Sequence, residues 1–237
     1  MHYLPILTTI ITFVFAAAVF SRFRARHGAH LLFWGIGLVM YGLGALTEVI
    51  LLFTFNAAAL KIWYLCGAML TAAWLGQGTV NLLVRRRGVA TTLNTILIIV
   101  SVLAVVLVLA APITPAAATY NLSVPLSSQY REILTRSSLI ILMTILLNIY
   151  GTFTLVGGAI YSAYIFWRKH VLFNRMVGNI LIAAGAILPA MGGTFIKIGL
   201  PDFLYLSEFL GAILMYVGFL QATAVFPVKS TAPAATD

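Results

Sequence analysis

Charged residues and cysteines are scarce in this chain. Only 8% of the 237 residues are charged, five residues are Asp or Glu, and Cys66 is the single cysteine. One cysteine excludes an internal disulfide and a cysteine-based metal cluster. A chain with so little charge, 62% hydrophobic residues and a mean hydropathy of +1.07 cannot form a water-exposed surface. The composition therefore predicts a protein covered by lipid.

Groups that carry chemistry are also missing from the apolar segments. The histidines lie at segment ends or in connections: His2, His27, His30 and His170. Intramembrane hydrolases and metal or haem enzymes need a nucleophile with a base, clustered carboxylates or inward-facing histidines. The last apolar stretch also has no lysine for a retinal Schiff base. We predict no enzymatic activity, no metal and no cofactor, although a bound lipid or other amphiphile fits such a chain.

Seven apolar stretches take up most of the sequence, each about 20 residues or more and so long enough to cross a bilayer. They cover residues 3–20, 31–54, 60–84, 92–111, 138–167, 175–198 and 203–226. Runs this uniformly apolar must be helices, because an unpaired backbone amide is costly in hydrocarbon and barrel strands alternate. The predicted fold class is all-α. We expect one polytopic seven-helix membrane bundle, residues 1–227, followed by a short tail, residues 228–237.

Lysines and arginines are distributed unevenly between the two ends of these stretches. One end has Arg22, Arg24, Arg26, Arg85, Arg86, Arg87, Arg168, Lys169, Arg175 and Lys229; the other has Lys61, Arg131, Arg136 and Lys197. Because cytoplasmic loops carry the excess of positive charge, we predict an outside N-terminus and a cytoplasmic tail in the plasma (inner) membrane. This excess accounts for the net charge of +9 without a nucleic-acid partner. The longest connection, 112–137, is then external, and its prolines predict an irregular lid.

Glycines recur every seven residues, which is two helical turns, in four of the stretches. The pairs are Gly35 and Gly42, Gly37 and Gly44, Gly151 and Gly158, Gly178 with Gly185 and Gly192, and Gly211 and Gly218. Such stripes let a neighbouring helix approach closely. We therefore expect spans two, five, six and seven at the centre, and the glycine-free spans one and four facing lipid. Pro189, midway along span six, predicts a kink that is either static or a hinge.

Two acids and two bases fall in one outer layer of the predicted bundle: Glu48, Lys61, Lys197 and Glu208. Charges within a membrane are costly, so each requires a partner or a function. One interpretation is that the four residues form ion pairs that tie spans two, three, six and seven together. The other is an outward-facing pocket whose opposite charges suit a zwitterionic or amphiphilic molecule.

A second polar layer, nearer the cytoplasm, consists of side-chain amides. Its members are Gln77, Asn81, Asn148, Asn179 and Gln221, with Asn148 close to the midplane. Hydrogen bonds between helices are a sufficient explanation for such amides. The alternative is a polar path that links the two layers.

Several stretches resemble a group of bacterial seven-span integral membrane proteins without an assigned function. They are LCGAMLTAAWLGQGTVNL at 65–82, GTFTLVGGAIYS at 151–162, GNILIAAGAILPAMGG at 178–193, and residues 209–220. A weaker resemblance is to the seven-helix sensor regions of membrane histidine kinases, through Glu48, Trp63-Tyr64-Leu65 and Gly67. This second resemblance implies signalling, which here would need a separate cytoplasmic effector because little chain follows the last span.

These features leave three functions open. We favour a ligand-binding or sensing module that acts through partner proteins, because the outer charges are otherwise costly. The alternatives are an accessory or structural subunit of a larger complex with other membrane subunits, and a small-solute or lipid transporter. Membrane lipids are partners in all three.

Overall fold

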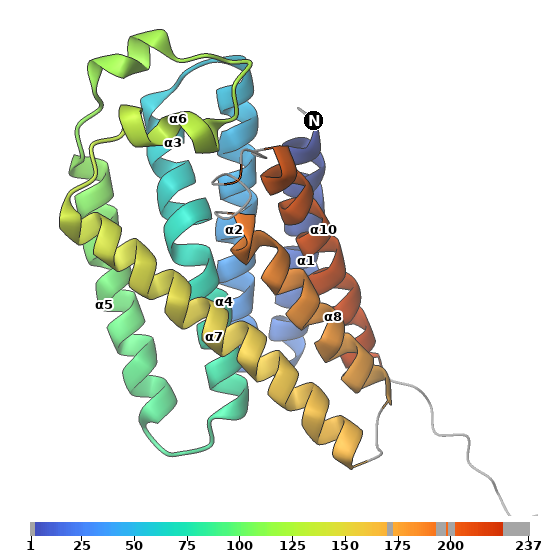
Figure 1. Ribbon diagram of the computed structural model, residues 1–237. Helices are drawn as coiled ribbons and strands as arrows, with labels where there is room; N and C mark the ends of the chain where they lie inside the picture. Colours follow the sequence, from blue (N-terminus) through green and yellow to red (C-terminus); the bar gives the residue numbers. More distant parts are fainter. Residues whose placement is uncertain (1–2, 170–172, 193–197, 199–201, 225–237) are drawn as a thin grey trace, which may run out of the picture.

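The computed structural model describes residues 3–169, 173–192, 198 and 202–224. Within these ranges, seven helical segments are long and apolar enough to cross a membrane, which confirms the predicted all-α seven-helix architecture (Figure 1). They are α1 (Leu4–Arg26), α2 (Ala29–Phe53), the combined α3 (Ala57–Ile62), η1 (Trp63–Leu70) and α4 (Thr71–Leu83), α5 (Val89–Ala110), α7 (Ser138–Arg168), α8 (Phe173–Ala190) and α10 (Asp202–Thr223).

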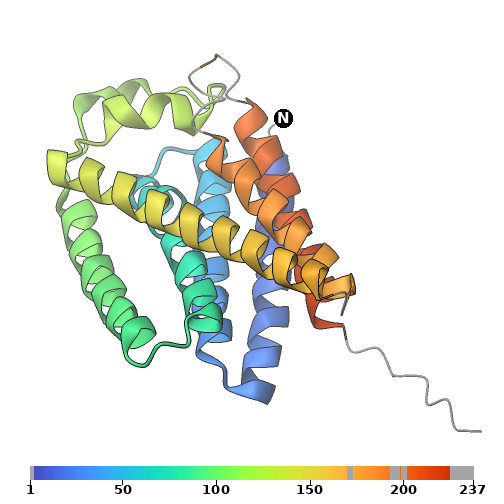
Figure 2. The same cartoon turned by 60° about the horizontal axis from the view of Figure 1, so that its bottom comes forward.

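The third span and α2 form the centre of the bundle, and α5 lies at its edge (Figures 1 and 2). Buried residues make up 56% of the third span and 50% of α2, against 28% of α7 and 17% of α8. The expectation that spans five and six are central is therefore wrong, and the third span was overlooked. Span one, expected to face lipid, is 39% buried, whereas only 22% of α5 is buried, as expected for an exposed span.

The glycine stripes mark where two helices touch, and this explains the error. A Cβ atom added at Gly185 of α8 would lie 2.7 Å from the Gly211 carbonyl oxygen of α10. One added at Gly218 would lie 2.6 Å from the Gly178 carbonyl oxygen. Backbone thus meets backbone along α8 and α10, although α8 is otherwise at the surface. A close helix pair can form at the periphery, so glycine spacing identifies contacts rather than depth.

The third span contains a π-helical segment, η1, in which the backbone is wider than in an α-helix. The Thr71 hydroxyl donates to the Cys66 carbonyl (2.6 Å), and the Asn148 amide of α7 donates to the Ala68 carbonyl (2.8 Å). These side chains satisfy carbonyls where the helix is wound loosely. Segments of this kind are rare and occur frequently at functional sites.

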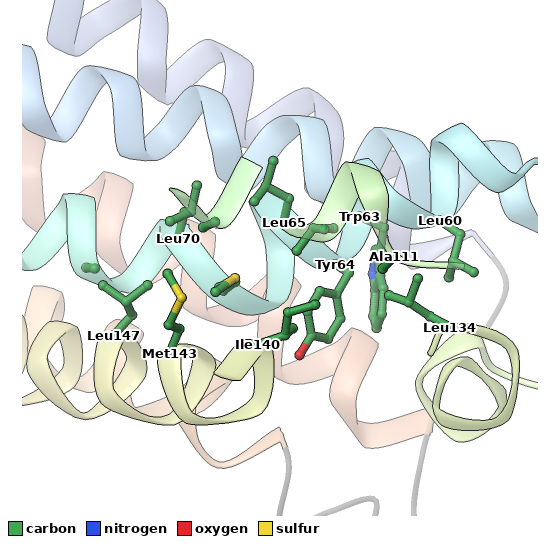
Figure 3. Close-up of a cluster of buried hydrophobic side chains, with 14 of the residues drawn as sticks. Leu60, Trp63, Tyr64, Leu65, Leu70, Ala111, Leu134, Ile140, Met143 and Leu147 are labelled. Atoms are coloured by element: carbon green, nitrogen blue, oxygen red, sulfur yellow. The ribbon is translucent and has the colours of Figure 1, made fainter. Parts of the chain in front are cut away.

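The connection 112–137, which we call the lid, is ordered. It contains the short η2 (Pro115–Thr119) and α6 (Leu126–Ile133), and its two ends pair through an antiparallel bridge between Ile113 and Leu134. The predicted irregular lid is therefore wrong in its local structure, because backbone pairing and buried apolar residues of α6 hold it against the bundle. Figure 3 shows this packing, with Leu134 of the lid in one cluster with Trp63 and Tyr64 of η1.

Candidate functional site: a cavity beneath the lid

A cavity of about 870 Å³ lies between α2, η1, α7 and the facing parts of α8 and α10. Residues of the lid line it from above, and apolar side chains make up most of its wall. Sites for small molecules commonly have volumes of about 300–1,000 Å³ and mostly apolar linings with a few polar groups. The cavity has the size and composition of such a site.

Two carboxylates line this cavity, Glu48 from α2 and Glu208 from α10. Glu48 is 2% exposed, and its Oε1 atom is buried without a hydrogen bond to any described residue. The Tyr205 hydroxyl approaches the Glu48 carboxylate without reaching hydrogen-bond geometry. The Tyr41 hydroxyl of α2 donates to the Glu208 backbone carbonyl (2.7 Å) and so joins α2 to α10 at this level. The two acids that the sequence placed in one layer thus share one cavity.

The predicted clasp between these acids and Lys61 does not form. The Lys61 ammonium donates to the Leu109 carbonyl (2.7 Å) and is not among the residues that line the cavity. The last carbonyls of α5 lack partners within the helix, and a helix C-terminus attracts a cation, so Lys61 is bound there. Lys197, the other predicted base, lies outside the described residues.

Two arginines of the lid supply positive charge to the cavity, and they were not among the predicted site residues. Arg131 and Arg136 both line it, with their guanidinium carbons 5.8 and 5.0 Å from the centre of the Tyr130 ring. A hydrogen bond from the Arg131 side chain to the Tyr130 hydroxyl raises the pKa of Arg131, so its charge is kept. The Arg136 Nε atom is buried and makes no hydrogen bond within the described chain.

Neutral polar groups line the wall between the two kinds of charge. The hydroxyls of Tyr64 and Thr144 share a hydrogen bond of 2.9 Å, which joins η1 to α7. Asn148 lines the cavity beside them and is held by the Ala68 carbonyl of η1. Asn148 therefore belongs to the cavity rather than to the second polar layer in which it was predicted.

The second polar layer exists in a smaller form that joins α4, α5 and α7. Gln77 is fully buried, and its amide donates to Asn94 Oδ1 of α5 (2.6 Å). Asn81 donates to the same Asn94 oxygen (2.8 Å), and the Tyr150 hydroxyl of α7 donates to Gln77 Oε1. The sequence did not identify Asn94 or Tyr150 as members. The network holds the outer helix α5 in place, as the hydrogen-bonding interpretation of these amides predicted.

Asn179 and Gln221 do not join this network. The Asn179 amide donates to the Arg175 carbonyl in its own helix (2.7 Å), and Gln221 is exposed on α10. The prediction of one five-member layer is wrong because α8 and α10 present these amides away from α4. Two residues at a similar depth in the bundle can still lie on sides of their helices that face different neighbours.

Pro189 lies near the end of α8, which ends at Ala190, and the rest of the predicted span, from residue 193 to 197, lies outside the described residues. The Met191 amide still donates to the Ile187 carbonyl (3.0 Å) beyond the proline. A Cβ atom on Gly211 would lie 2.8 Å from Pro189 Cδ, so the proline ring packs directly on α10. Pro189 also lines the cavity. These contacts favour a fitted, static position over a free hinge.

Replacing Glu48 by glutamine tests what this carboxylate does for the fold. Breaking a buried ion pair by removing one partner costs about 3–5 kcal/mol. Here Glu48 has no cationic partner among the described residues, so we expect Glu48→Gln to leave the melting temperature of ligand-free protein unchanged or to raise it. Thermal unfolding followed by size-exclusion chromatography measures this. A fall comparable to the loss of a buried ion pair would show that Glu48 is a structural clasp.

The side chains that line the cavity are groups able to bind a ligand. In the part of the chain that the structure describes, no group of three His, Cys, Asp or Glu residues could hold a metal ion. Opposite charges, hydroxyls and apolar walls suit recognition of a ligand. The comparisons with known proteins add no identity, because no protein-family model, no curated protein and no solved structure matches this chain.

Proposed function

We propose that this protein is a ligand-binding or sensing module of the plasma membrane that holds an amphiphilic molecule beneath its lid. One observation carries the proposal: a cavity of about 870 Å³ combines apolar walls with two acidic and two basic side chains. An amphiphile can pack its apolar tail against the apolar walls while its polar head binds the charged side chains. A purely structural bundle has no need of such a space, since helices in membranes associate by close packing.

The position of α7 supports entry of the ligand from the bilayer. In Figures 1 and 2, α7 crosses the bundle obliquely in front of α2 and α4. Its residues Ile145, Ile149 and Phe153 line the cavity and are also 50%, 50% and 76% exposed. Apolar side chains exposed on a membrane span face lipid. An apolar tail can therefore leave the cavity past α7 while the polar head stays beneath the lid.

Binding would bridge the elements that surround the cavity. The cavity is lined by α2, η1, α7, α8, α10 and the lid, so one ligand touches all of them. A ligand that prefers one arrangement of these elements shifts the protein towards it. In the orientation expected from the distribution of arginines, this change would reach a separate effector on the cytoplasmic side.

The proposal is tested by filling the cavity. Ala68 lines it from η1, whereas Val102 is 60% exposed on the lipid side of α5. We expect amphiphiles to stabilise the wild-type protein and the control Val102→Phe. At a hundredfold excess over Kd the gain is about 2.7 kcal/mol, or about 5–10 °C in Tm. Ala68→Phe should lose this gain because the ring occupies the space of the ligand. Melting curves recorded in a steroid detergent, with and without amphiphile, measure this change in Tm.

The same experiment separates the proposal from the other functions. An accessory subunit needs no cavity, so a broad amphiphile panel without any saturable stabilisation would contradict the proposed binding and favour that role. Equal stabilisation of wild type and Ala68→Phe would place binding elsewhere and also contradict it. A transporter would in addition move its ligand across proteoliposomes, a step that the binding module does not require.

A further inference from the structure

We infer that the ligand has a zwitterionic head, with a cationic group between Glu48 and Glu208 and an anionic group at Arg131 and Arg136. This inference rests on the proposed function and names the class of molecule bound at the same site. It follows from three properties of the cavity in the described part of the chain: acids without an ion pair on one wall, arginines without an ion pair on another, and the different elements from which the two walls come.

The acidic wall has no counter-charge among the residues that the structure describes. Glu48 and Glu208 line one cavity and interact electrostatically with each other, and Glu48 Oε1 has no hydrogen bond within the described chain. Two carboxylates facing a common space repel each other unless a cation or a proton lies between them. The ring of Tyr41, two helical turns before Glu48 on α2, also lines the cavity, and aromatic faces attract ammonium groups. This wall is suited to an amine or quaternary ammonium group.

The basic wall is likewise without a counter-charge. Neither Arg131 nor Arg136 forms an ion pair with a carboxylate of the described residues; both lie over Tyr130 instead. Arg136 Nε is buried without a hydrogen bond in the described chain. Stacking on the ring fixes the planar guanidinium groups, whose N–H donors match the oxygens of a phosphate or carboxylate. This wall is suited to an anionic group.

The acids and the arginines come from different elements. The acids come from α2 and α10, and the arginines come from the lid at and just beyond α6. Among the described residues, Glu48 interacts electrostatically with Glu208 and Tyr205, and Arg131 interacts with Tyr130 and Tyr64. A singly charged ligand would satisfy one wall and leave the other unpaired. A zwitterion satisfies both, and the apolar opening past α7 accommodates its tail.

The test uses four amphiphiles with the same dodecyl chain and different heads. They are dodecylphosphocholine, dodecyltrimethylammonium, dodecyl phosphate and the nonionic dodecyl maltoside, added to full-length protein in a steroid detergent. We expect the Kd of dodecylphosphocholine to be about tenfold lower, or more, than that of either singly charged amphiphile, as for one charged hydrogen bond. Glycerophosphocholine, which has no tail, distinguishes a lipid from a free zwitterion.

Charge variants test which wall binds the cationic group of the ligand and which binds the anionic group. Glu48→Gln should abolish the preference for dodecylphosphocholine over dodecyl phosphate, because the cationic group loses its partner. Arg136→Gln should abolish the preference over dodecyltrimethylammonium. Glu132→Gln is the matched control, since Glu132 is an exposed acid of α6 that does not line the cavity. Melting curves without ligand show whether each variant is folded, and Glu208→Gln replaces Glu48→Gln if that variant is not.

The outcomes separate this inference from the function on which it rests. Saturable binding of all four amphiphiles with equal affinity would overturn the zwitterion and keep the amphiphile site. Unchanged preferences in folded Glu48→Gln and Arg136→Gln would also overturn it. Absence of saturable binding by any of them would overturn both proposals. Glycerophosphocholine binding as tightly as dodecylphosphocholine would keep the charge assignment and overturn the amphiphile.

Discussion

Replacing Gly151 by valine is expected to prevent the bundle from folding. A Cβ atom at this position of α7 would lie 2.2 Å from the Ala72 carbonyl carbon and 2.5 Å from the Ala73 amide nitrogen. Both are backbone atoms of α4, so no side-chain rotation can relieve the overlap. Separating α7 from α4 would open the most buried span and the floor of the cavity. We expect a loss of about 3 kcal/mol or more, seen as aggregation on size-exclusion chromatography.

The same substitution at Gly157, in the same helix, is the matched control. A Cβ atom there would meet nothing within 4 Å. We therefore expect Gly157→Val to elute as wild type and to keep its melting temperature. If both variants fold equally well, α7 does not lie against α4 as the structure has it. The cavity would then need a different wall.

Replacing Gln77 by leucine is expected to cause the second-largest loss of stability. Its side chain bonds with Asn94, the Ala90 carbonyl and Tyr150. Hydrogen bonds between membrane helices contribute about 0.6–2 kcal/mol each, so the loss of these three contacts should total about 2–6 kcal/mol. For a chain of this size, that lowers the melting temperature by about 5–25 °C. Thermal unfolding in detergent measures it.

Two further variants decide whether the effect comes from the network. Asn179→Leu removes an amide that bonds only within α8, so it should change the melting temperature little. Asn94→Leu should cost about as much as Gln77→Leu, and the double variant should cost less than the sum of the two, because both remove the bond between Gln77 and Asn94. Additive losses would show that the two amides act independently and that the network does not anchor α5.

The spans could be predicted because lipid imposes a strong local rule. Each span is read from its own residues, and the sequence placed Ser138–Arg168 within one residue of its observed ends. The local structure of the lid was harder to predict, because its prolines and serines are also typical of an irregular loop. Its order depends on contacts with distant residues, as when the Tyr120 hydroxyl donates to the Leu51 carbonyl (3.0 Å).

The acids of the site could be predicted, and the bases could not. A glutamate within an apolar helix is unusual, so Glu48 and Glu208 stand out from their own surroundings. Arg131 and Arg136 lie in a polar connection where arginines are ordinary, and only the folding of the lid over α2 and η1 brings them to the cavity. Lys61 lies in the span where it was predicted, but its side chain bonds to the Leu109 carbonyl of α5 and does not line the cavity.

The most direct test of the central claim is an experimental density map of the protein extracted together with its native lipids. We predict continuous density beneath the lid, with a head group between the Glu48 and Glu208 carboxylates and the Arg136 guanidinium and a tail leaving past Ile149 of α7. A collapsed cavity, with Glu48 paired to a cationic side chain of the protein itself, would contradict the account.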